Sequence, residues 1–306
     1  MQWPAQSIGV TGANGQLGRE LCRQLGAVAV PLPRSSLDIT NPAEIRSVLD
    51  RWQPLAFINC AAWTAVDAAE TQTEACFAAN ANAVASLASA CRTTGTLLVQ
   101  VSTDYVFGAD RTRDFPYCEE DATGPLNAYG SSKLAGELAA RGYDNHLIVR
   151  TCGLYSVGDN GPVRGRNFLD TMLSLAQERP EVSVVSDQFC TPSYVPHVAR
   201  GILGLMAAAQ TGTFHVTNSG GTSWHALAEE LFQQAGKPTR AKPIAAREYP
   251  SKVERPSYSV LNTKKLANVM TNGLPDWRQG VADYAKDTLK RIPSNLFLEP
   301  SQTGVL

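Results

Sequence analysis

The chain has 306 residues, of which 43% are hydrophobic and 18% are charged, and its formal net charge is −1. This length can bury a substantial core, either as one large α/β unit or as two interleaved lobes. The balanced charge leaves no basic excess for binding a polyanion across the whole surface, so we expect no nucleic-acid partner.

Strand-like and helix-like segments alternate through the first half of the chain. Short apolar runs predict strands at 7–10, 28–32, 56–60, 97–102 and 146–150, and apolar periodicity predicts helices at 16–25, 41–52, 74–93 and 129–141. Asn41 and Pro42 suit the N-cap and the first turn of the second helix. Such alternation is typical of an α/β fold with a doubly wound parallel sheet, the Rossmann arrangement.

The rhythm breaks after Arg150. Helices are predicted at 168–178, 195–209 and 224–235, strands at 182–185 and 213–216, and a mostly extended or looped stretch at about 237–260, which holds four prolines. We expect residues 1–152 to form a Rossmann domain that also receives elements from about 180–212. Residues 153–306 are expected to form mainly a smaller, interleaved α/β substrate-binding lobe that is discontinuous in sequence.

A glycine-rich turn lies between the first predicted strand and the first predicted helix. Its glycines, Gly12, Gly15 and Gly18, have the spacing G-x-x-G-x-x-G. Glycines let the backbone approach a pyrophosphate closely, and the positive end of the following helix stabilises the phosphate charge. The turn therefore predicts a dinucleotide site.

The segment after the second predicted strand bears on whether the cofactor is NADPH or NADH. An acidic residue there would bind the adenosine ribose and favour NADH. The segment instead reads Arg34-Ser35-Ser36, and Arg34 either contacts a 2′-phosphate, as NADPH would require, or is simply solvated. Asp38 is placed to approach the adenine edge.

Tyr129 and Lys133 are four residues apart, so they share one face of a predicted helix. Upstream, an apolar strand ends in Ser102, Thr103 and Asp104, at the sheet edge where such folds hold ligands. Hydride transfer to a ketone creates an alkoxide, which a phenol can protonate if a nearby ammonium and the nicotinamide charge lower the phenol pKa. A threonine hydroxyl can polarise the ketone. Together with the glycine turn, these residues predict a reductase.

Other features bound the location and the partners. The seven cysteines are scattered without a C-x-x-C pair, which fits reduced thiols in a cytoplasm. No signal peptide is recognised, and the longest apolar run is shorter than a membrane span of about 20 residues. The four histidines lack metal-ligand spacing, so no metal site is predicted. A homodimer is an option because dimers are frequent in this fold.

Several longer strings resemble the dTDP-4-dehydrorhamnose reductase family of extended short-chain dehydrogenases. They lie at 11–18, 59–67, 102–107, 125–137, 167–168, 186–188, 221–224 and 255–256. The similarity therefore extends over nearly the whole chain. The strings Ser-Thr-Asp-Tyr-Val-Phe and Pro-Leu-Asn-x-Tyr-Gly are its most specific parts.

The resemblance implies an NAD(P)H-dependent oxidoreductase that reduces the 4-keto group of a nucleotide-linked deoxysugar, converting dTDP-4-dehydro-L-rhamnose to dTDP-L-rhamnose. It implies that Tyr129 is the proton donor, that Lys133 modulates it and binds the ribose, and that Thr103 and Asp104 line the substrate. The residues implied to border the cofactor are Gly12, Asn14, Gly15, Gln16, Leu17, Ala61, Ala62, Thr64 and Ser102. Those implied to contact the nucleotide sugar are Asn167, Gln188 and Arg255.

Two features differ from the family, and two other functions stay open. Cys152-Gly153 stands where members often have Ser-Trp, with the tryptophan against the sugar. The loop that follows is longer and carries Arg164 and Arg166, which either grip a diphosphate or lie in solvent. An epimerase of the same fold would share the tyrosine and lysine. A non-catalytic regulatory subunit, similar to the methionine adenosyltransferase β subunit, can also keep them.

Overall fold

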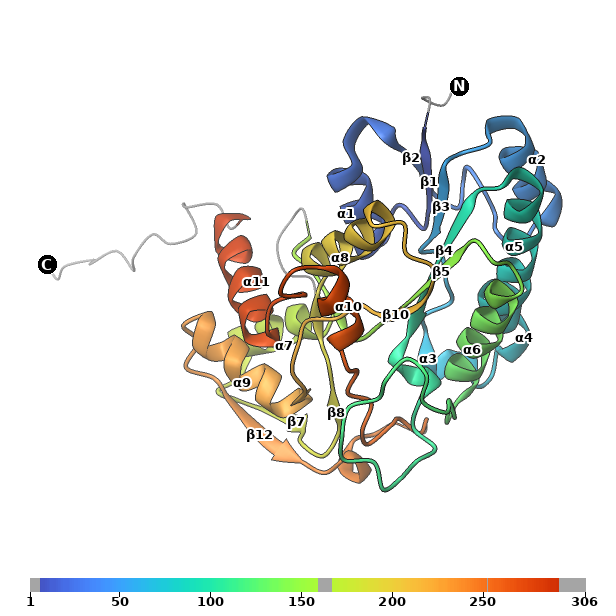
Figure 1. Ribbon diagram of the computed structural model, residues 1–306. Coiled ribbons are helices and arrows are strands. Elements are labelled where there is room, and N and C mark those ends of the chain that lie inside the picture. The colour runs from blue at the N-terminus through green and yellow to red at the C-terminus, as the bar shows by residue number, and fades with distance from the viewer. Residues whose placement is uncertain (1–5, 159–166, 252, 292–306) are drawn as a thin grey trace, which may run out of the picture.

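The computed structural model describes residues 6–158, 167–251 and 253–291. In this part of the chain, a six-stranded sheet with all neighbours parallel has the order β2-β1-β3-β4-β5-β10 (Figure 1). Its strands are β1 (Ile8–Thr11), β2 (Ala29–Leu32), β3 (Ala56–Asn59), β4 (Leu97–Thr103), β5 (His146–Thr151) and β10 (Gly212–His215). The predicted doubly wound sheet is confirmed. Its strand order reverses between β1 and β3, where such sheets open a crevice for ligands.

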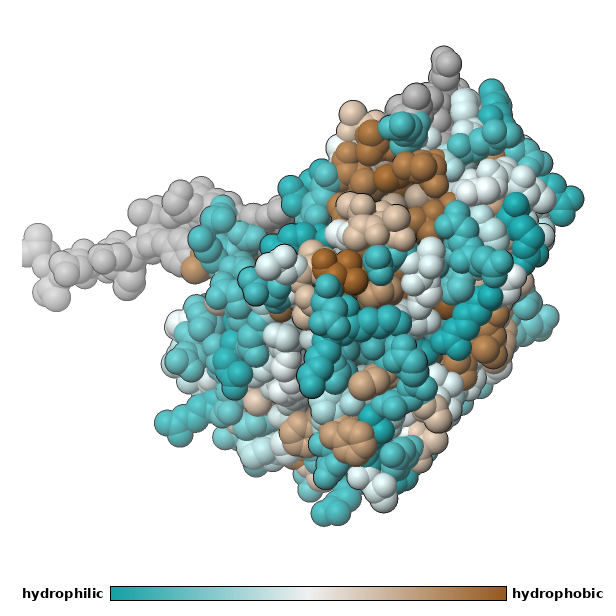
Figure 2. Space-filling view, viewed as in Figure 1, coloured by the Kyte–Doolittle hydropathy of each residue, from teal (hydrophilic) through white to brown (hydrophobic). Residues whose placement is uncertain are grey.

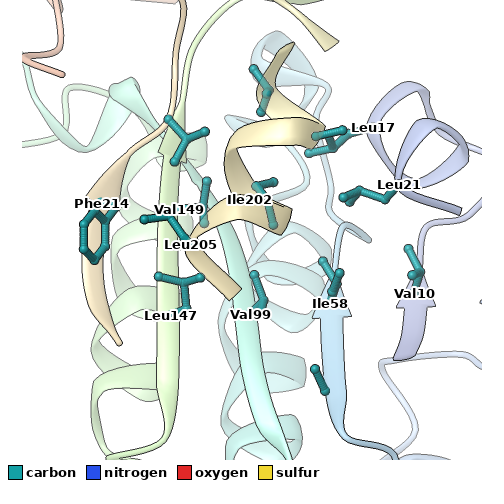
Figure 3. Packing of buried hydrophobic residues seen from close by; sticks show 14 of the residues in the cluster. Val10, Leu17, Leu21, Ile58, Val99, Leu147, Val149, Ile202, Leu205 and Phe214 are labelled. Atoms are coloured by element: carbon teal, nitrogen blue, oxygen red, sulfur yellow. The ribbon is translucent and has the colours of Figure 1, made fainter. Parts of the chain in front are cut away.

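Helices cover both faces of this sheet. On one face lie α1 (Gln16–Leu25) and α8 (Val195–Ala207), and on the other α2 (Pro42–Trp52), α5 (Ala83–Thr94) and α6 (Ala128–Arg141). Successive strand residues point to opposite faces, so Ile58 packs in the first layer and Phe57 in the second. Figure 3 shows Ile202 of α8 beside Leu17 and Leu21 of α1, in the same cluster as Val99 and Ile58 of the sheet.

The start of α2 follows the sequence prediction. Asn41 is its N-cap, and the Asn41 side chain accepts hydrogen bonds from the backbone of Ala43 at 3.1 Å and of Glu44 at 3.4 Å. Pro42 occupies the first helical position, where a missing N–H costs nothing.

The single helix predicted at 74–93 is wrong in one respect. The structure has α4 (Thr73–Phe77), then a π-helical turn η2 (Ala78–Asn82), then α5. A π-turn accommodates an extra residue without changing apolar periodicity enough to be noticed in a sequence. The interruption faces α6, where it has a role in the candidate site.

The second half of the chain builds a smaller lobe. Its helices α7 (Phe168–Glu178), α9 (Trp224–Gln234) and α11 (Trp277–Arg291) pack with β7 (Glu181–Val185) and β12 (Arg240–Ile244) around a separate apolar cluster. The stretch at 237–260, predicted to be mostly extended or looped, contains the strand β12, which pairs in parallel with β7. Pro243 is tolerated because this two-stranded sheet consists of edges.

Short elements complete the chain. They are η1 (Gly26–Val28), α3 (Val66–Ala69), η3 (Asp104–Val106), β6 (Leu154–Tyr155), β8 (Phe189–Cys190), β9 (Ser193–Tyr194), β11 (Thr222–Ser223), η4 (Ala246–Glu248) and α10 (Lys264–Val269). Figure 2 shows a mostly polar face on which apolar side chains gather near α1, α8 and β2. Among the described residues, no helix has both the length and the apolar character that crossing a membrane requires.

Candidate active site

The turn after β1 has the geometry of a phosphate cradle. Gly12 has φ +62°, and a Cβ there would lie 2.8 Å from the Ala61 backbone nitrogen. A Cβ on Gly18 would lie 2.3 Å from the Gly12 carbonyl oxygen, so the fold itself requires both glycines. Gly15 differs, because it is exposed at the N-cap of α1 and a Cβ would meet, within the described part of the chain, just the Gly12 oxygen, at 3.2 Å. Its bare backbone leaves room for a pyrophosphate at the helix N-terminus.

Gln16 joins this turn to the second half of the chain. Its Oε1 accepts hydrogen bonds from Ser156 Oγ at 2.9 Å and from Asn167 Nδ2 at 3.2 Å. Asn167 is also the N-cap of α7, where its Oδ1 accepts from the Asp170 backbone at 2.8 Å. The structure therefore places Asn167 beside the cofactor turn. Arg164 and Arg166 lie outside the described residues.

Asn14 and Leu17, the other two residues expected to border the cofactor at this turn, differ in exposure. Asn14 is exposed at the tip of the turn, whereas the Leu17 side chain is buried in the core between α1 and α8 (Figure 3). Leu17 can therefore offer a dinucleotide only its backbone.

Arg34 lies just beyond β2, and its side chain is 87% exposed. Its guanidinium is 3.5 Å from the Asp38 carboxylate. That carboxylate accepts hydrogen bonds from the hydroxyl and backbone N–H of Thr40, at 2.7 and 2.9 Å, and these bonds lower the Asp38 pKa. Asp38 is thus occupied by its own turn, while most donors of Arg34 face solvent, which fits a 2′-phosphate.

The loop after β3 carries Ala61, Ala62 and Thr64, the first two half-buried and the third exposed. Asn80, on the π-turn η2, fixes this loop: it accepts from the Trp63 backbone N–H at 2.9 Å and donates to the Trp63 carbonyl at 3.0 Å. The Asn80 amide also donates to Ser132 Oγ on α6, at 2.9 Å. Asn80 therefore ties the cofactor-side loop to the helix of the catalytic residues.

That helix, α6, is anchored at both ends. Its N-cap Asn127 accepts from the Gly130 backbone at 2.8 Å, and Gly130 lets the helix approach η3 so closely that a Cβ would lie 2.3 Å from the Tyr105 carbonyl oxygen. Further along, Glu137 makes two hydrogen bonds with the Arg150 guanidinium of β5, at 2.8 and 2.9 Å. Both side chains are fully buried, so this ion pair fixes α6 against the sheet.

Lys133 is buried next to the end of β4 that extends beyond the neighbouring strand β3. Pairing of β3 with β4 stops opposite Gln100, while β4 continues to Thr103. The carbonyl of the next residue, Val101, accepts from Lys133 Nζ at 2.6 Å and from Gln100 Nε2 at 2.8 Å. Burial lowers the pKa of Lys133 to about 8, so the ammonium form still dominates near neutral pH.

Tyr129 and Thr103 meet on the same side of the sheet. Burial raises the pKa of the Tyr129 phenol, and a hydrogen bond with Thr103 acts in the opposite direction. Among the protein's own groups, desolvation therefore outweighs the effect of this hydrogen bond on the phenol pKa. The lowered pKa expected from the sequence also depends on the nicotinamide charge, and it stays a prediction. A phenol with a raised pKa stays protonated, which is the state a proton donor needs.

Asp104 and Ser102 complete this edge of the sheet. Asp104 is buried, which raises its pKa, and its carboxylate accepts hydrogen bonds from Ser259 at 2.6 Å and from Thr103 at 3.1 Å. Ser102 Oγ is buried with no hydrogen-bond partner among the described residues. An orphaned hydroxyl beside the catalytic strand end, together with the glycine cradle, fits a bound dinucleotide.

The burial of Lys133 leads to a stability prediction for Lys133→Met. A folded-state pKa of about 8 against an ordinary 10.5 means that burying the ammonium costs on the order of 3 kcal/mol below pH 8. Above pH 8 the folded protein loses this proton while the unfolded chain keeps it, so the cost shrinks toward pH 10.5. The Val101 carbonyl keeps its Gln100 donor, so Lys133→Met should be more stable than the unmodified protein at pH 7, by a margin that declines between pH 8 and 10.

Denaturant unfolding of both proteins from pH 7 to 10 measures this difference. Lys264→Met serves as the control because Lys264 is exposed at the start of α10, and its difference from the unmodified protein should not vary with pH. A pH-independent difference for Lys133→Met would show that the Lys133 ammonium is not buried as described.

A pocket of about 660 Å³ lies next to the carboxyl end of β4, since Tyr105 lines it. Gln188 and Arg255, both expected from the sequence to contact substrate, line it. It is also lined by aromatic and basic residues that sequence reasoning missed, namely Tyr105, Phe168, Trp224, Arg247 and Tyr249. Aromatic faces and guanidinium groups suit a nucleotide base and a diphosphate respectively. Tyr105, Phe168 and Trp224 lie inside strings that resemble the family, and this resemblance was the signal in the sequence that could have identified them.

The departure at Gly153 is explained by Trp224. Gly153 has φ +49°, and a Cβ there would lie 3.1 Å from Trp224 Cη2 and 3.2 Å from Pro192 Cα. Position 153 therefore has no room for a tryptophan side chain, and the indole that borders the pocket comes from the first residue of α9.

Two of the four histidines lie in the protein interior. His215 and His197 are buried, and burial lowers the pKa of both. Within the described ranges, no group of three or more histidine, cysteine, aspartate and glutamate side chains could hold a metal ion.

The fold and this site together define a dinucleotide-dependent reductase of the extended short-chain dehydrogenase type. A family model described as the RmlD substrate binding domain matches residues 6–290. The dTDP-4-dehydrorhamnose reductase of Burkholderia thailandensis is 39% identical over 302 residues, which cover 92% of this chain and 99% of that protein. The chain belongs to the dTDP-4-dehydrorhamnose reductase family, as the sequence strings indicated.

Other relatives agree with this membership. The dTDP-4-keto-6-deoxy-D-glucose reductase of Streptomyces niveus is 39% identical and covers 82% of this chain and 87% of its own length. The dTDP-4-dehydrorhamnose reductase of Bacillus anthracis, solved in complex with NADP, has a TM-score of 0.86 at 34% identity and covers 94% of this chain and 100% of that chain. UDP-glucose 4-epimerase of Thermus thermophilus, at 18% identity, TM-score 0.77 and coverage of 92% and 99%, shares the fold.

Proposed function

We propose that the protein uses NADPH to reduce the C4 ketone of a dTDP-linked 4-keto-6-deoxysugar, with dTDP-4-dehydro-L-rhamnose giving dTDP-L-rhamnose. The observation that carries this proposal is the pair Tyr129 and Lys133 on one face of α6, with the Tyr129 ring against Tyr105, which lines the same pocket as Trp224 and Arg255. The names of the relatives at 34–39% identity support the choice of substrate.

NADPH is the proposed cofactor for two reasons. No acidic side chain follows β2 directly, and the exposed guanidinium of Arg34 is placed to bind a 2′-phosphate. The Bacillus anthracis relative solved with NADP supports this choice.

Each catalytic side chain has one task in the proposed reaction. The ketone carbon accepts the hydride that a nicotinamide cofactor would supply when bound. The Thr103 hydroxyl donates to the ketone oxygen, for which it must leave its bond to Asp104. The Tyr129 phenol then gives its proton to that oxygen, and the nearby Lys133 ammonium stabilises the phenolate that remains. The cofactor is bordered by Ser102, Ala61, Ala62 and Thr64. The nucleotide sugar is held by Gln188 and Arg255.

The two halves of the chain divide these tasks in our proposal. Residues 1–152, together with elements from about 180–212, bind the cofactor, and residues 153–306 mainly bind the substrate. We also propose a cytoplasmic homodimer: all seven cysteines are free thiols, which fits a reducing compartment.

An assay of the purified protein tests the function. It combines dTDP-4-dehydro-L-rhamnose or dTDP-4-keto-6-deoxy-D-glucose with NADPH or NADH and follows cofactor oxidation and the sugar product. We expect one NADPH consumed per sugar reduced, and slower turnover with NADH. Epimerised sugar without net cofactor consumption would identify an epimerase instead. No turnover, with tight binding to a synthetase, would identify a regulatory subunit.

A further inference from the structure

Arg255 is held by a side chain from the other half of the chain. Its Nη2 donates to Asp67 Oδ2 at 2.9 Å, and Asp67 belongs to α3, which follows β3. Ser251 bridges the two, because its hydroxyl donates to Asp67 Oδ1 at 3.0 Å and accepts from Arg255 Nη1. Arg255 and Ser251 line the substrate pocket, so a guanidinium of this pocket is already engaged by a carboxylate.

The two members of this ion pair differ in exposure. The Asp67 side chain is 64% exposed, whereas that of Arg255 is 22% exposed. A carboxylate in contact with water holds a guanidinium weakly, and it loses little when it returns to solvent. A diphosphate carries more charge than a carboxylate, and several of its oxygens can accept hydrogen bonds from the same guanidinium. Arg255 should therefore exchange Asp67 for a diphosphate at small cost.

Arg255 also lies close to the reacting groups. Burial raises the pKa of Tyr105, and the charge of Arg255 opposes this rise, which requires proximity. The Tyr105 ring contacts the Tyr129 ring edge to face, with centroids 5.8 Å apart. A guanidinium this near the proton donor can hold the diphosphate of a sugar whose ketone faces Tyr129.

We propose that Asp67 competes with the substrate diphosphate for Arg255, so that this pair is a latch that binding of the nucleotide sugar opens. The inference rests on the proposed function, since it takes the substrate to be a nucleoside diphosphate sugar. Asp67 is then a specificity-determining residue: it lowers affinity for every ligand, and only a ligand with a strongly charged diphosphate displaces it.

The experiment measures KM for dTDP-4-dehydro-L-rhamnose, and Kd for dTDP in the presence of saturating NADP⁺, for matched variants. Asp67→Asn removes the competing charge and keeps the shape, so both constants should fall by about twofold to fivefold, the range for an exposed ion pair. Glu254→Gln removes a carboxylate that lines the same pocket but pairs with Arg111, at 2.6 Å, and not with Arg255. It should change KM clearly less than Asp67→Asn does.

A double variant separates the release of Arg255 from a general effect of removing negative charge near the pocket. In Arg255→Gln, which itself raises KM, adding Asp67→Asn should change KM no further, because no guanidinium remains to be freed. The proposal is overturned if Asp67→Asn leaves KM unchanged or raises it, if Glu254→Gln lowers KM equally, or if the fall persists with Arg255→Gln. Absence of turnover and of dTDP binding in the unmodified protein would instead refute the proposed function.

Discussion

The Tyr129→Phe variant is expected to lose about three orders of magnitude in kcat, within the range attributed to general acid catalysis, while NADPH affinity stays within about twofold. The substitution removes only the hydroxyl, so the aromatic ring keeps its edge-to-face contact with Tyr105. Thr103 can still polarise the ketone, but the alkoxide then has no proton donor in reach. Binding of the dinucleotide depends on the glycine turn and should not change.

Steady-state kinetics with dTDP-4-dehydro-L-rhamnose and a fluorescence titration with NADPH measure the two effects. Tyr143→Phe is the matched control: Tyr143 lies just beyond the other end of α6, and its hydroxyl donates to the Thr96 carbonyl at 3.0 Å. This control should keep full kcat. Near-normal turnover in Tyr129→Phe would refute the role assigned to the phenol.

Gly15→Val is expected to abolish NADPH binding in a protein that still folds. At the N-cap of α1 the backbone of Gly15 is extended, with φ −76°, so a side chain is tolerated there. Among the described residues, a Cβ would approach the Gly12 carbonyl oxygen alone, at 3.2 Å. The valine methyl groups would instead project into the space that the pyrophosphate needs, and the phosphates could not reach the helix N-terminus.

A NADPH titration and a thermal melt of the same sample check this prediction. Gly142→Val is a suitable control, because Gly142 is exposed, has negative φ and also has a carbonyl oxygen 3.2 Å from its Cβ position. It should bind NADPH normally. Undiminished binding by Gly15→Val would contradict the assignment of the turn, and loss of folded protein would contradict the steric reading of Gly15.

The parallel sheet was predictable because its signals are local. Apolar runs mark the strands β1 and β3, Asn41 and Pro42 mark the start of α2, and three glycines mark the cradle. The four-residue spacing of Tyr129 and Lys133 needs only helix geometry to place both on one face. Each of these inferences depends on residues within one or two turns of one another, where chain stiffness alone determines the outcome.

The missed features depend on contacts between distant parts of the chain. The π-turn around Asn80 is held by hydrogen bonds to Trp63 and Ser132, neither of which adjoins it in sequence. The strand β12 pairs with β7 despite Pro243, because edge strands tolerate a missing N–H. The raised pKa of Tyr129 comes from burial, which a spacing pattern does not contain.

The position of β10 at one edge of the sheet has a consequence for biosynthesis. This strand is translated long after β5, with which it pairs in the sheet. Until it emerges from the ribosome, β5 presents unpaired backbone groups along a strand whose side chains are apolar on both faces, a surface that invites aggregation. The sheet of the nucleotide-binding half is therefore complete only after residues 212–215 have been made, and a chain that terminates before them would expose β5 as an apolar edge strand.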